Sequence, residues 1–151
     1  MKATIYYLVL AFLIISCKNE AASELDSKMA EFDQLKEQTL ALHDKVMPET
    51  MYTMDLQAEI DEHLTSKNVD EAVAEELVIA QLDLSDAYDA MMTWMKDYSM
   101  SFPFEEETPE SLQELSSQIA QLEERYSAME MIETDTHNAI SIAESLLAAI
   151  E

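Results

Sequence analysis

Apolar residues recur at alternating spacings of four and three along residues 69–99. They are Val73, Leu77, Ala80, Leu84, Ala87, Met91, Trp94 and Tyr98. This heptad spacing places them along one face of a helix, which we call its seam, and is typical of coiled-coil packing. Asn68 precedes the stretch and Glu71 lies three residues on, which resembles a capping box. The pattern therefore predicts a helix over 69–99.

A second seam follows over residues 109–150. Its members are Leu112, Leu115, Ile119, Leu122, Tyr126 and Met129, followed less regularly by Thr136, Ile140, Ala143, Leu147 and Ile150. Thr108 is a good N-cap residue, and proline is favoured at the first helical position, where Pro109 stands. We therefore expect this helix to begin at Pro109.

The earliest pattern, over residues 23–66, is the least regular. Its apolar residues are Met29, Phe32, Leu35, Leu42 and Val46, then Leu56, Ile60 and Leu64. Pro48 lies between the two groups, and a proline inside a helix removes one hydrogen bond and crowds the preceding turn. Either the helix ends and restarts there, or it continues with a kink. We favour the kink, because Met47 would be a poor N-cap, and expect the bend to shift the seam.

The connections between these helices are short: Lys67-Asn68 and residues 100–107. Short connections place consecutive helices antiparallel. The sequence thus predicts an all-α fold, an elongated up-down-up three-helix bundle with coiled-coil-like packing over residues 23–151, as one domain. Its helices would span about 23–66, 69–99 and 109–150, and the plan leaves no room for a deep pocket.

Residues 1–16 have the pattern of a targeting segment. Lys2 is followed by fourteen apolar or small residues, too few to cross a bilayer as a helix, which takes about 20. The run ends in Ile14-Ile15-Ser16-Cys17, which resembles a bacterial lipobox. Cys17 is the only cysteine, so it has no disulfide partner in the chain.

We predict a lipoprotein signal peptide over 1–16, lipidation of Cys17 as the membrane anchor, and a tether over 17–22. The alternative is an ordinary signal peptide with an unused cysteine. Lys18 after the cysteine favours the outer membrane of a bacterial envelope.

The composition excludes several classes of function. The chain has 32 Asp and Glu residues against eight Lys and Arg, a net charge of −24. Nucleic acid is therefore not an expected partner, because binding to phosphates depends on lysine and arginine. Glycine is absent, which removes phosphate-cradling loops and nucleophile elbows. With the single cysteine assigned to lipid and no catalytic constellation recognisable, we expect no enzyme activity.

Methionines gather in two windows, residues 47–54 and 91–100. Antiparallel pairing about Lys67-Asn68 sets residue i against roughly residue 135 − i, which brings the windows together near Pro48. The side chains concerned are His43, Met47, Met91, Met92 and Met95. Thioethers with an imidazole select Cu(I), but methionine also fills irregular gaps in a core. Both interpretations stay open: a packed kink, which we favour, or a Cu(I) site. His63 and His137 are expected far from the kink.

Two stretches carry a family resemblance. Leu42–Met51 (LHDKVMPETM) and Tyr88–Tyr98 (YDAMMTWMKDY) resemble a family of small acidic envelope lipoproteins of bacteria, catalogued as "viral A-type inclusion protein". The resemblance implies a lipid-anchored helical bundle and implies no activity. It also implies a distinguishing patch formed by His43, Met47, Pro48, Met91, Met92, Trp94 and Met95.

The leading functional hypothesis is a non-catalytic interaction or scaffold module with an unidentified protein partner. Phe102 and Phe104, in the loop before the last helix, are candidate contact residues. The alternative is that one or both close the end of the bundle. The second hypothesis is binding or buffering of Cu(I) by the His43 and methionine cluster.

Overall fold

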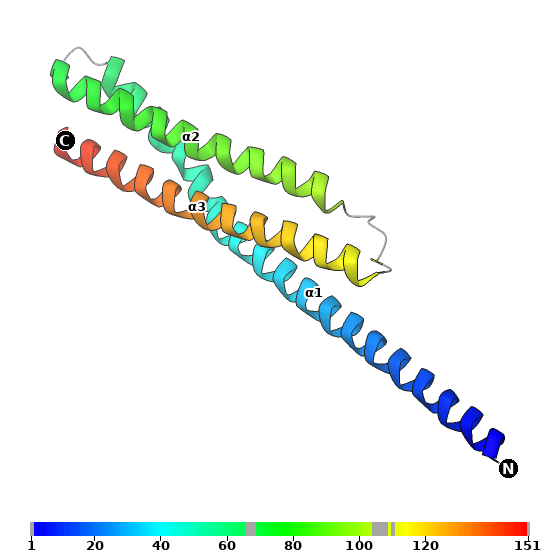
Figure 1. Cartoon of the computed structure of the whole chain (residues 1–151). Helices are drawn as coiled ribbons and strands as arrows, with labels where there is room; N and C mark the ends of the chain where they lie inside the picture. The colour runs from blue at the N-terminus through cyan, green and yellow to red at the C-terminus, as the bar shows by residue number, and fades with distance from the viewer. Residues whose placement is uncertain (1, 66–68, 104–108, 110, 151) are drawn as a thin grey trace.

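A computed structural model describes residues 2–65, 69–103, 109 and 111–150, and for residues 2–22 it describes the backbone alone. These residues form three helices: α1 (Lys2–Thr65), α2 (Glu71–Ser101) and α3 (Leu112–Ile150) (Figure 1). Each helix packs against the other two. The protein is therefore an all-α three-helix bundle, as predicted. The amino-terminal part of α1 extends beyond the ends of α2 and α3 (Figure 1).

Polar contacts define the directions of the helices. The Lys45 ammonium donates to Glu133 over 2.5 Å, and the Tyr52 hydroxyl donates to Glu144 over 3.2 Å. These pairs are 88 and 92 positions apart, and a near-constant separation means that α1 and α3 run parallel. Helix α2 runs in the direction opposite to α1 (Figure 1). The up-down-up order is thus confirmed.

The seam of α2 is the one that the sequence predicted. Seven of its eight expected residues are buried, from Leu77 to Tyr98, and Val73 is partly buried against the same core. The helix begins two residues later than expected, because Asp70 is the N-cap and its carboxylate accepts from the Ala72 amide over 3.0 Å. Asn68, the expected cap, lies outside the described residues.

Helix α3 also begins later than expected, at Leu112 instead of Pro109. The Ser111 hydroxyl accepts from the Glu114 amide over 3.2 Å, so Ser111 is the cap, while Thr108 lies outside the described residues. The seam of α3 also includes Ile132 and Ala139, which are buried and were not expected there. Four of the expected seam residues are only partly buried: Leu112, Tyr126, Ile140 and Ile150. The alternation of three and four continues through Ile132 and Ala139, and this spacing decides burial more than side-chain size does.

Helix α1 passes through Pro48 without interruption, which confirms a continuous helix over a stop and restart. Its ribbon changes direction between cyan and teal, the colours of the part that contains Pro48 (Figure 1). The expected shift of the seam was wrong, because buried threonines continue it across the proline. They are Thr39, Thr50 and Thr53. Pro48 itself is exposed, so its ring lies on the outer face of the bend.

The start of α1 corrects one further boundary. We expected the first helix to begin near residue 23 after a tether over 17–22, but the backbone is helical from Lys2 onward. Packing against the core begins with Leu25 and Met29. The helix therefore starts earlier than predicted, while its described contacts with the bundle start close to the expected position.

The core consists of two hydrophobic clusters, one on each side of the bend. One cluster includes Val46, Met91 and Ile132; the other includes Leu56 and Ala139. Between them along α1 and α3 lie three fully buried threonines, which we call the threonine waist: Thr50, Thr53 and Thr136. The core is thus narrow and polar at the level of the bend.

Candidate functional site

A column of stacked rings joins α1 to α2 on the amino-terminal side of the waist. The His43 ring stacks on Trp94, with centroids 5.6 Å apart and planes 16° apart, and Trp94 stacks on Tyr98 at 4.9 Å. Phe102 continues the column and contacts Phe32 at 6.1 Å. Aromatic pairs in such arrangements stabilise by about 0.5–1.5 kcal/mol each beyond burial. The column therefore fixes the two helices relative to each other.

Trp94 also ties this column to α3. Its indole Nε1 donates to the backbone carbonyl of Arg125 over 2.8 Å. A buried indole N–H without a partner would be costly, so this bond lets the tryptophan occupy the core. The Arg125 guanidinium meanwhile contacts Ser101 at 3.3 Å and Asp97 at 3.7 Å. Trp94 is thus the residue at which all three helices meet.

His43 lies against the core, with 17 % of its side chain exposed. Its Nδ1 is 2.9 Å from a carboxylate oxygen of Asp44. A carboxylate accepts hydrogen bonds, so Nδ1 carries the proton and Nε2 carries the lone pair in the neutral ring. Nε2 is buried and has no hydrogen-bond partner in the described chain. The imidazole therefore offers a buried acceptor nitrogen beside Trp94.

Three of the four predicted methionines lie in the same cluster as Trp94. Met91 is fully buried, and Met47 and Met92 are partly buried against it. Met95 is 37 % exposed. The pairing rule set His43 against roughly residue 92. The ring that stacks on His43 is that of Trp94, so the rule was right to within one helical turn. Among the described residues, no group of three or more His, Cys, Asp and Glu side chains is placed to hold a metal. A metal beside His43 would therefore depend on methionine thioethers for its other ligands.

Burial settles the role of Phe102. Its ring is buried at the end of the column, where it packs on Tyr98 and Phe32. Of the two interpretations of Phe102, a partner contact or closure of the end of the bundle, its burial favours the second. The residue caps α2, and its ring closes this end of the core. Burial also raises the pKa of the neighbouring Tyr98 phenol. Phe104 lies outside the described residues.

His137 was placed wrongly by sequence. Its Nε2 contacts a carboxylate oxygen of Glu49, directly after Pro48, and its side chain is exposed. Pairing about the first turn related α1 to α2 alone, whereas α3 also runs along the bend. The parallel register of α1 and α3, which brings Lys45 to Glu133, could have located His137 correctly.

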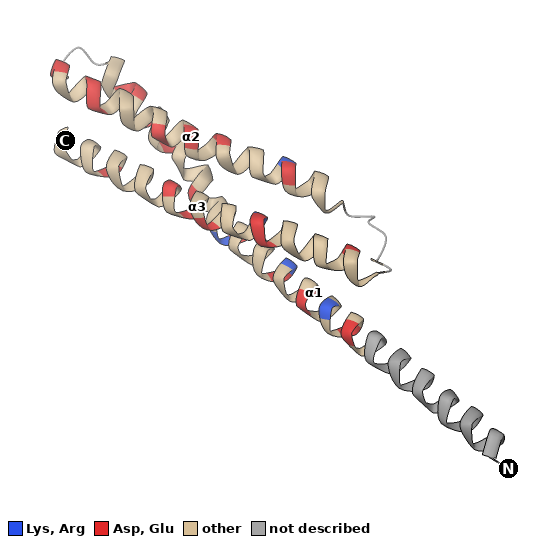
Figure 2. Ribbon diagram, in the orientation of Figure 1, with Lys and Arg blue, Asp and Glu red and all other residues tan. Residues whose placement is uncertain are grey.

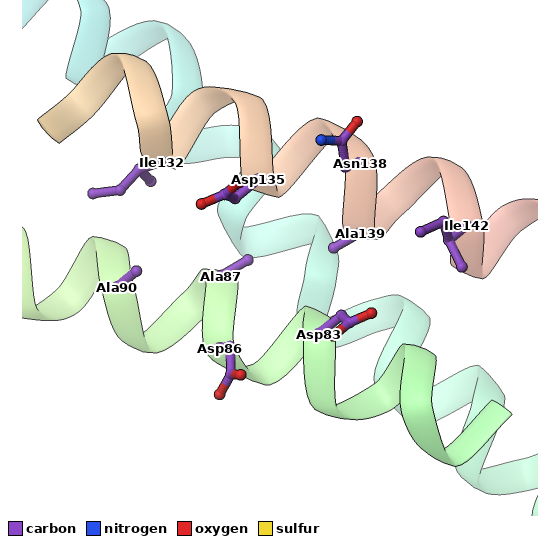
Figure 3. Close-up of a pocket in the computed structure, with 9 residues that line it drawn as sticks. All are labelled: Asp83, Asp86, Ala87, Ala90, Ile132, Asp135, Asn138, Ala139 and Ile142. Carbon is purple, nitrogen blue, oxygen red and sulfur yellow. The ribbon is translucent and has the colours of Figure 1, made fainter. Parts of the chain in front are cut away.

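Sequence reasoning also missed a groove between α2 and α3. It has a volume of about 380 Å³ and lies at the level of the waist. Its lining consists of Asp83, Asp86, Ala87 and Ala90 on α2, and Ile132, Asp135, Asn138, Ala139 and Ile142 on α3 (Figure 3). The alanines at Ala87, Ala90 and Ala139 were the available signal, because small side chains where two helices meet leave space between them. This groove is open to the surface.

The surroundings of the groove are acidic. Residues 69–95 contain seven Asp or Glu residues and no Lys or Arg, and residues 126–150 contain four and none. Figure 2 shows the Lys and Arg positions of the described chain mainly along α1. Within the described chain, Asp83, Asp86 and Asp135 make no hydrogen bond or ion pair. The groove thus combines an apolar floor with uncompensated carboxylates.

The described chain holds no helix long and apolar enough to cross a bilayer. At Cys17 only the helical backbone is described. No known protein family, curated protein or solved structure matches this chain. The lipidation of Cys17 and the resemblance to envelope lipoproteins therefore stay predictions.

Proposed function

We propose that the protein is a non-catalytic interaction module of a bacterial envelope, anchored by lipid on Cys17. The anchor is supported by the short apolar run over residues 3–16, which ends in Ile14-Ile15-Ser16-Cys17. A lipid on Cys17 would hold the chain at the membrane, with the outer membrane favoured by Lys18. The bundle would extend from that anchor along α1.

The anchor has a direct test. Cells that express the full chain are labelled with an alkyne-bearing fatty acid, and the labelled protein is detected after purification. The wild-type chain should take up label, and Cys17→Ser should lose it. A wild-type chain without label would contradict the anchor and leave the bundle to act without it.

The interaction role is carried by one observation on α2. Val78, Ile79 and Leu82 form an apolar patch on its outer face, with Ile79 59 % and Leu82 60 % exposed. Single exposed apolar residues are ordinary, but adjoining ones indicate contact with another molecule. The rest of the chain is strongly acidic, with a net charge of −24, so an exposed apolar patch stands out on its surface. It fits a surface that a protein partner covers.

Photocrosslinking in intact cells tests this role. A benzophenone amino acid replaces Ile79 or Leu82 in two test strains and the exposed Glu37 of α1 in a control strain. We expect a discrete crosslinked product from position 82 and none from position 37. If positions 79 and 82 both give no product, the interaction role is wrong.

A second candidate function is Cu(I) binding, which the buried Nε2 of His43 favours specifically. The Asp44 carboxylate on Nδ1 would fix the tautomer and orient the ring, as carboxylates do behind histidine ligands. Thioethers of Met47, Met91 and Met92 are the soft ligands that Cu(I) prefers, and all three belong to the cluster around Trp94. Met95 would be at most a peripheral ligand, because it is partly exposed.

A competition titration with a Cu(I) chelator tests this candidate. One-to-one binding by the wild-type chain should be lost in a His43→Ala, Met91→Leu double variant, in which leucine keeps the buried volume. Met131→Leu, at an exposed position, is the matched control and should bind as wild type does. Equal binding by all three chains would mean loose association with surface carboxylates and would contradict the site.

A further inference from the structure

We propose that the groove between α2 and α3 receives a cationic amphipathic helix of the partner protein. This inference rests on the proposed interaction role. It adds the groove to the apolar patch on α2 as a second contact region, and it states the chemistry of the partner segment that the groove would bind. The occupant would complete a four-helix arrangement at the level of the waist. Its apolar stripe would face the alanines, and its lysines or arginines would face the aspartates.

The floor of the groove suits close approach of a helix. Ala87 and Ala90 point from α2 toward α3, and Ile132 and Ala139 point from α3 toward α2 (Figure 3). The methyl side chains of the alanines would let a helix of the partner lie close to the backbones of both α2 and α3. Ile142 lies at one end with 48 % of its surface exposed. A helix in the groove would remove this apolar surface from water, which favours binding.

The dimensions set the length of the contact. The lining residues on α3 run from Ile132 to Ile142, ten steps of a helix, which is about 15 Å. That length matches about three helical turns. The recognition mode is therefore an amphipathic helix in a groove, read through anchors at positions i, i+3 or i+4, and i+7.

Charge complementarity decides which helix fits. Asp83, Asp86 and Asp135 line the groove without a partner in the described chain, and the surrounding parts of α2 and α3 contribute no Lys or Arg over residues 69–95 and 126–150. An acidic or neutral helix would bring no compensating charge. A second copy of this chain would add another 24 net negative charges, which opposes self-association. A basic helix is attracted from a distance and compensates the carboxylates on arrival.

The test uses the full chain in nanodiscs of phosphatidylcholine and a fluorescent 18-residue peptide of Lys, Leu and Ala with one apolar stripe. A scrambled peptide has the same composition and charge but no stripe, and empty nanodiscs provide the blank. Binding is followed by fluorescence anisotropy. The striped peptide should bind at least tenfold more tightly than the scrambled one, and 0.5 M NaCl should weaken its binding.

Two groove variants locate the binding. Ala90→Trp fills the groove at an exposed position and should weaken binding at least tenfold. The triple variant Asp83→Asn, Asp86→Asn, Asp135→Asn should do the same. Its matched control, Asp26→Asn, Asp33→Asn, Glu37→Gln, removes the same charge from exposed sites on α1 and should change the Kd less than twofold. Circular dichroism checks that each variant remains helical.

Three results would overturn the inference: equal binding of the scrambled peptide, equal weakening by the two triple variants, or a dimer of the chain that Ala90→Trp dissociates. The last result would make a second copy the occupant. Crosslinking from Leu82 in cells tests the interaction role without the groove, so it shows which of the two proposals has failed. A product that persists in Ala90→Trp would keep the interaction role and reject the groove.

Discussion

At the scale of single residues, the buried threonines carry the polar part of the core. In α1 each hydroxyl bonds to its own helix: Thr39 to the Leu35 carbonyl at 2.7 Å, and Thr53 to the Thr50 carbonyl at 2.7 Å. Such back-bonding satisfies a buried hydroxyl and often bends the helix. Thr136 of α3 differs, because its buried hydroxyl has no partner in the described chain. The waist is thus satisfied on α1 and unsatisfied on α3.

Replacing Thr136 by valine should stabilise the protein. Valine keeps the branched shape and has a similar helix propensity, while an unsatisfied buried polar group costs about 1–3 kcal/mol. We expect Thr136→Val to raise the free energy of unfolding by about 1 kcal/mol. Urea denaturation followed by circular dichroism measures it.

Thr53→Val is the matched control for this change. It removes a hydroxyl that is bonded in the same waist, so we expect no gain and a loss of at most about 1 kcal/mol. If both variants gained equally, valine would be favoured at the waist for its apolar surface alone. The missing partner of Thr136 would then not be the cause.

At the scale of elements, regular apolar spacing predicted α2 well and α1 poorly. From Leu77 to Tyr98 the apolar residues of α2 leave no gap in the heptad pattern, and this seam is the buried one. In α1 the pattern is interrupted because Thr39, Thr50 and Thr53 fill seam positions. A threonine that bonds to its own backbone can be buried, and the residue type alone does not reveal this. The bundle was therefore predictable, but the continuous α1 seam was not.

The candidate site was predictable in part for a similar reason. Antiparallel pairing brought His43 to the level of Met91 and Met92, because the register of two helices follows from the length of the turn that connects them. Stacking of His43 on Trp94 and the free Nε2 depend on side-chain rotamers, which spacing does not determine. The groove was missed because it is formed by residues outside the seams, such as Ala90 and Asn138.

The bend in α1 leads to a prediction about Pro48. A proline in a helix interior costs about 3 kcal/mol relative to alanine, offset by about 0.4–1 kcal/mol because proline restricts the unfolded chain. Pro48 is exposed, so its removal loses no core contact. We expect Pro48→Ala to raise the free energy of unfolding by about 1–2 kcal/mol, measured by urea denaturation.

Pro103→Ala provides the control, since Pro103 follows the cap of α2 and stands outside a helix. Its stability should stay within about 0.5 kcal/mol of wild type. A loss of stability in Pro48→Ala would mean that the packing of the two clusters requires the bend that proline provides.

At the scale of the whole molecule, two electrostatic effects act in different ranges of pH. The net charge of −24 destabilises the compact state by self-repulsion. Against this, Lys45 lowers the pKa of the Glu133 carboxyl from 4.5, mainly by donating a hydrogen bond to it. Glu133 in turn raises the pKa of Lys45 from 10.5. A lowered acid pKa gives stability that is lost only as pH falls through it, and a raised lysine pKa gives stability lost only as pH rises through it.

Between pH 5 and pH 7.5 the pH lies above the lowered pKa of Glu133 and below the raised pKa of Lys45. This ion pair therefore stays charged, and mainly the net charge of the rest of the chain varies. As pH falls in this window, the net negative charge of the chain decreases and the repulsion weakens. We expect the urea midpoint to rise from pH 7.5 to pH 5, and to rise at pH 7.5 on addition of 0.5 M NaCl, which reduces the Debye length to a few ångströms. The urea midpoint of Glu133→Gln should rise in the same way, because the Lys45–Glu133 pair changes its charge only outside this range of pH. A midpoint that drops toward pH 5 in wild type but not in Glu133→Gln would mean that the Lys45–Glu133 contact outweighs the repulsion between the other carboxylates.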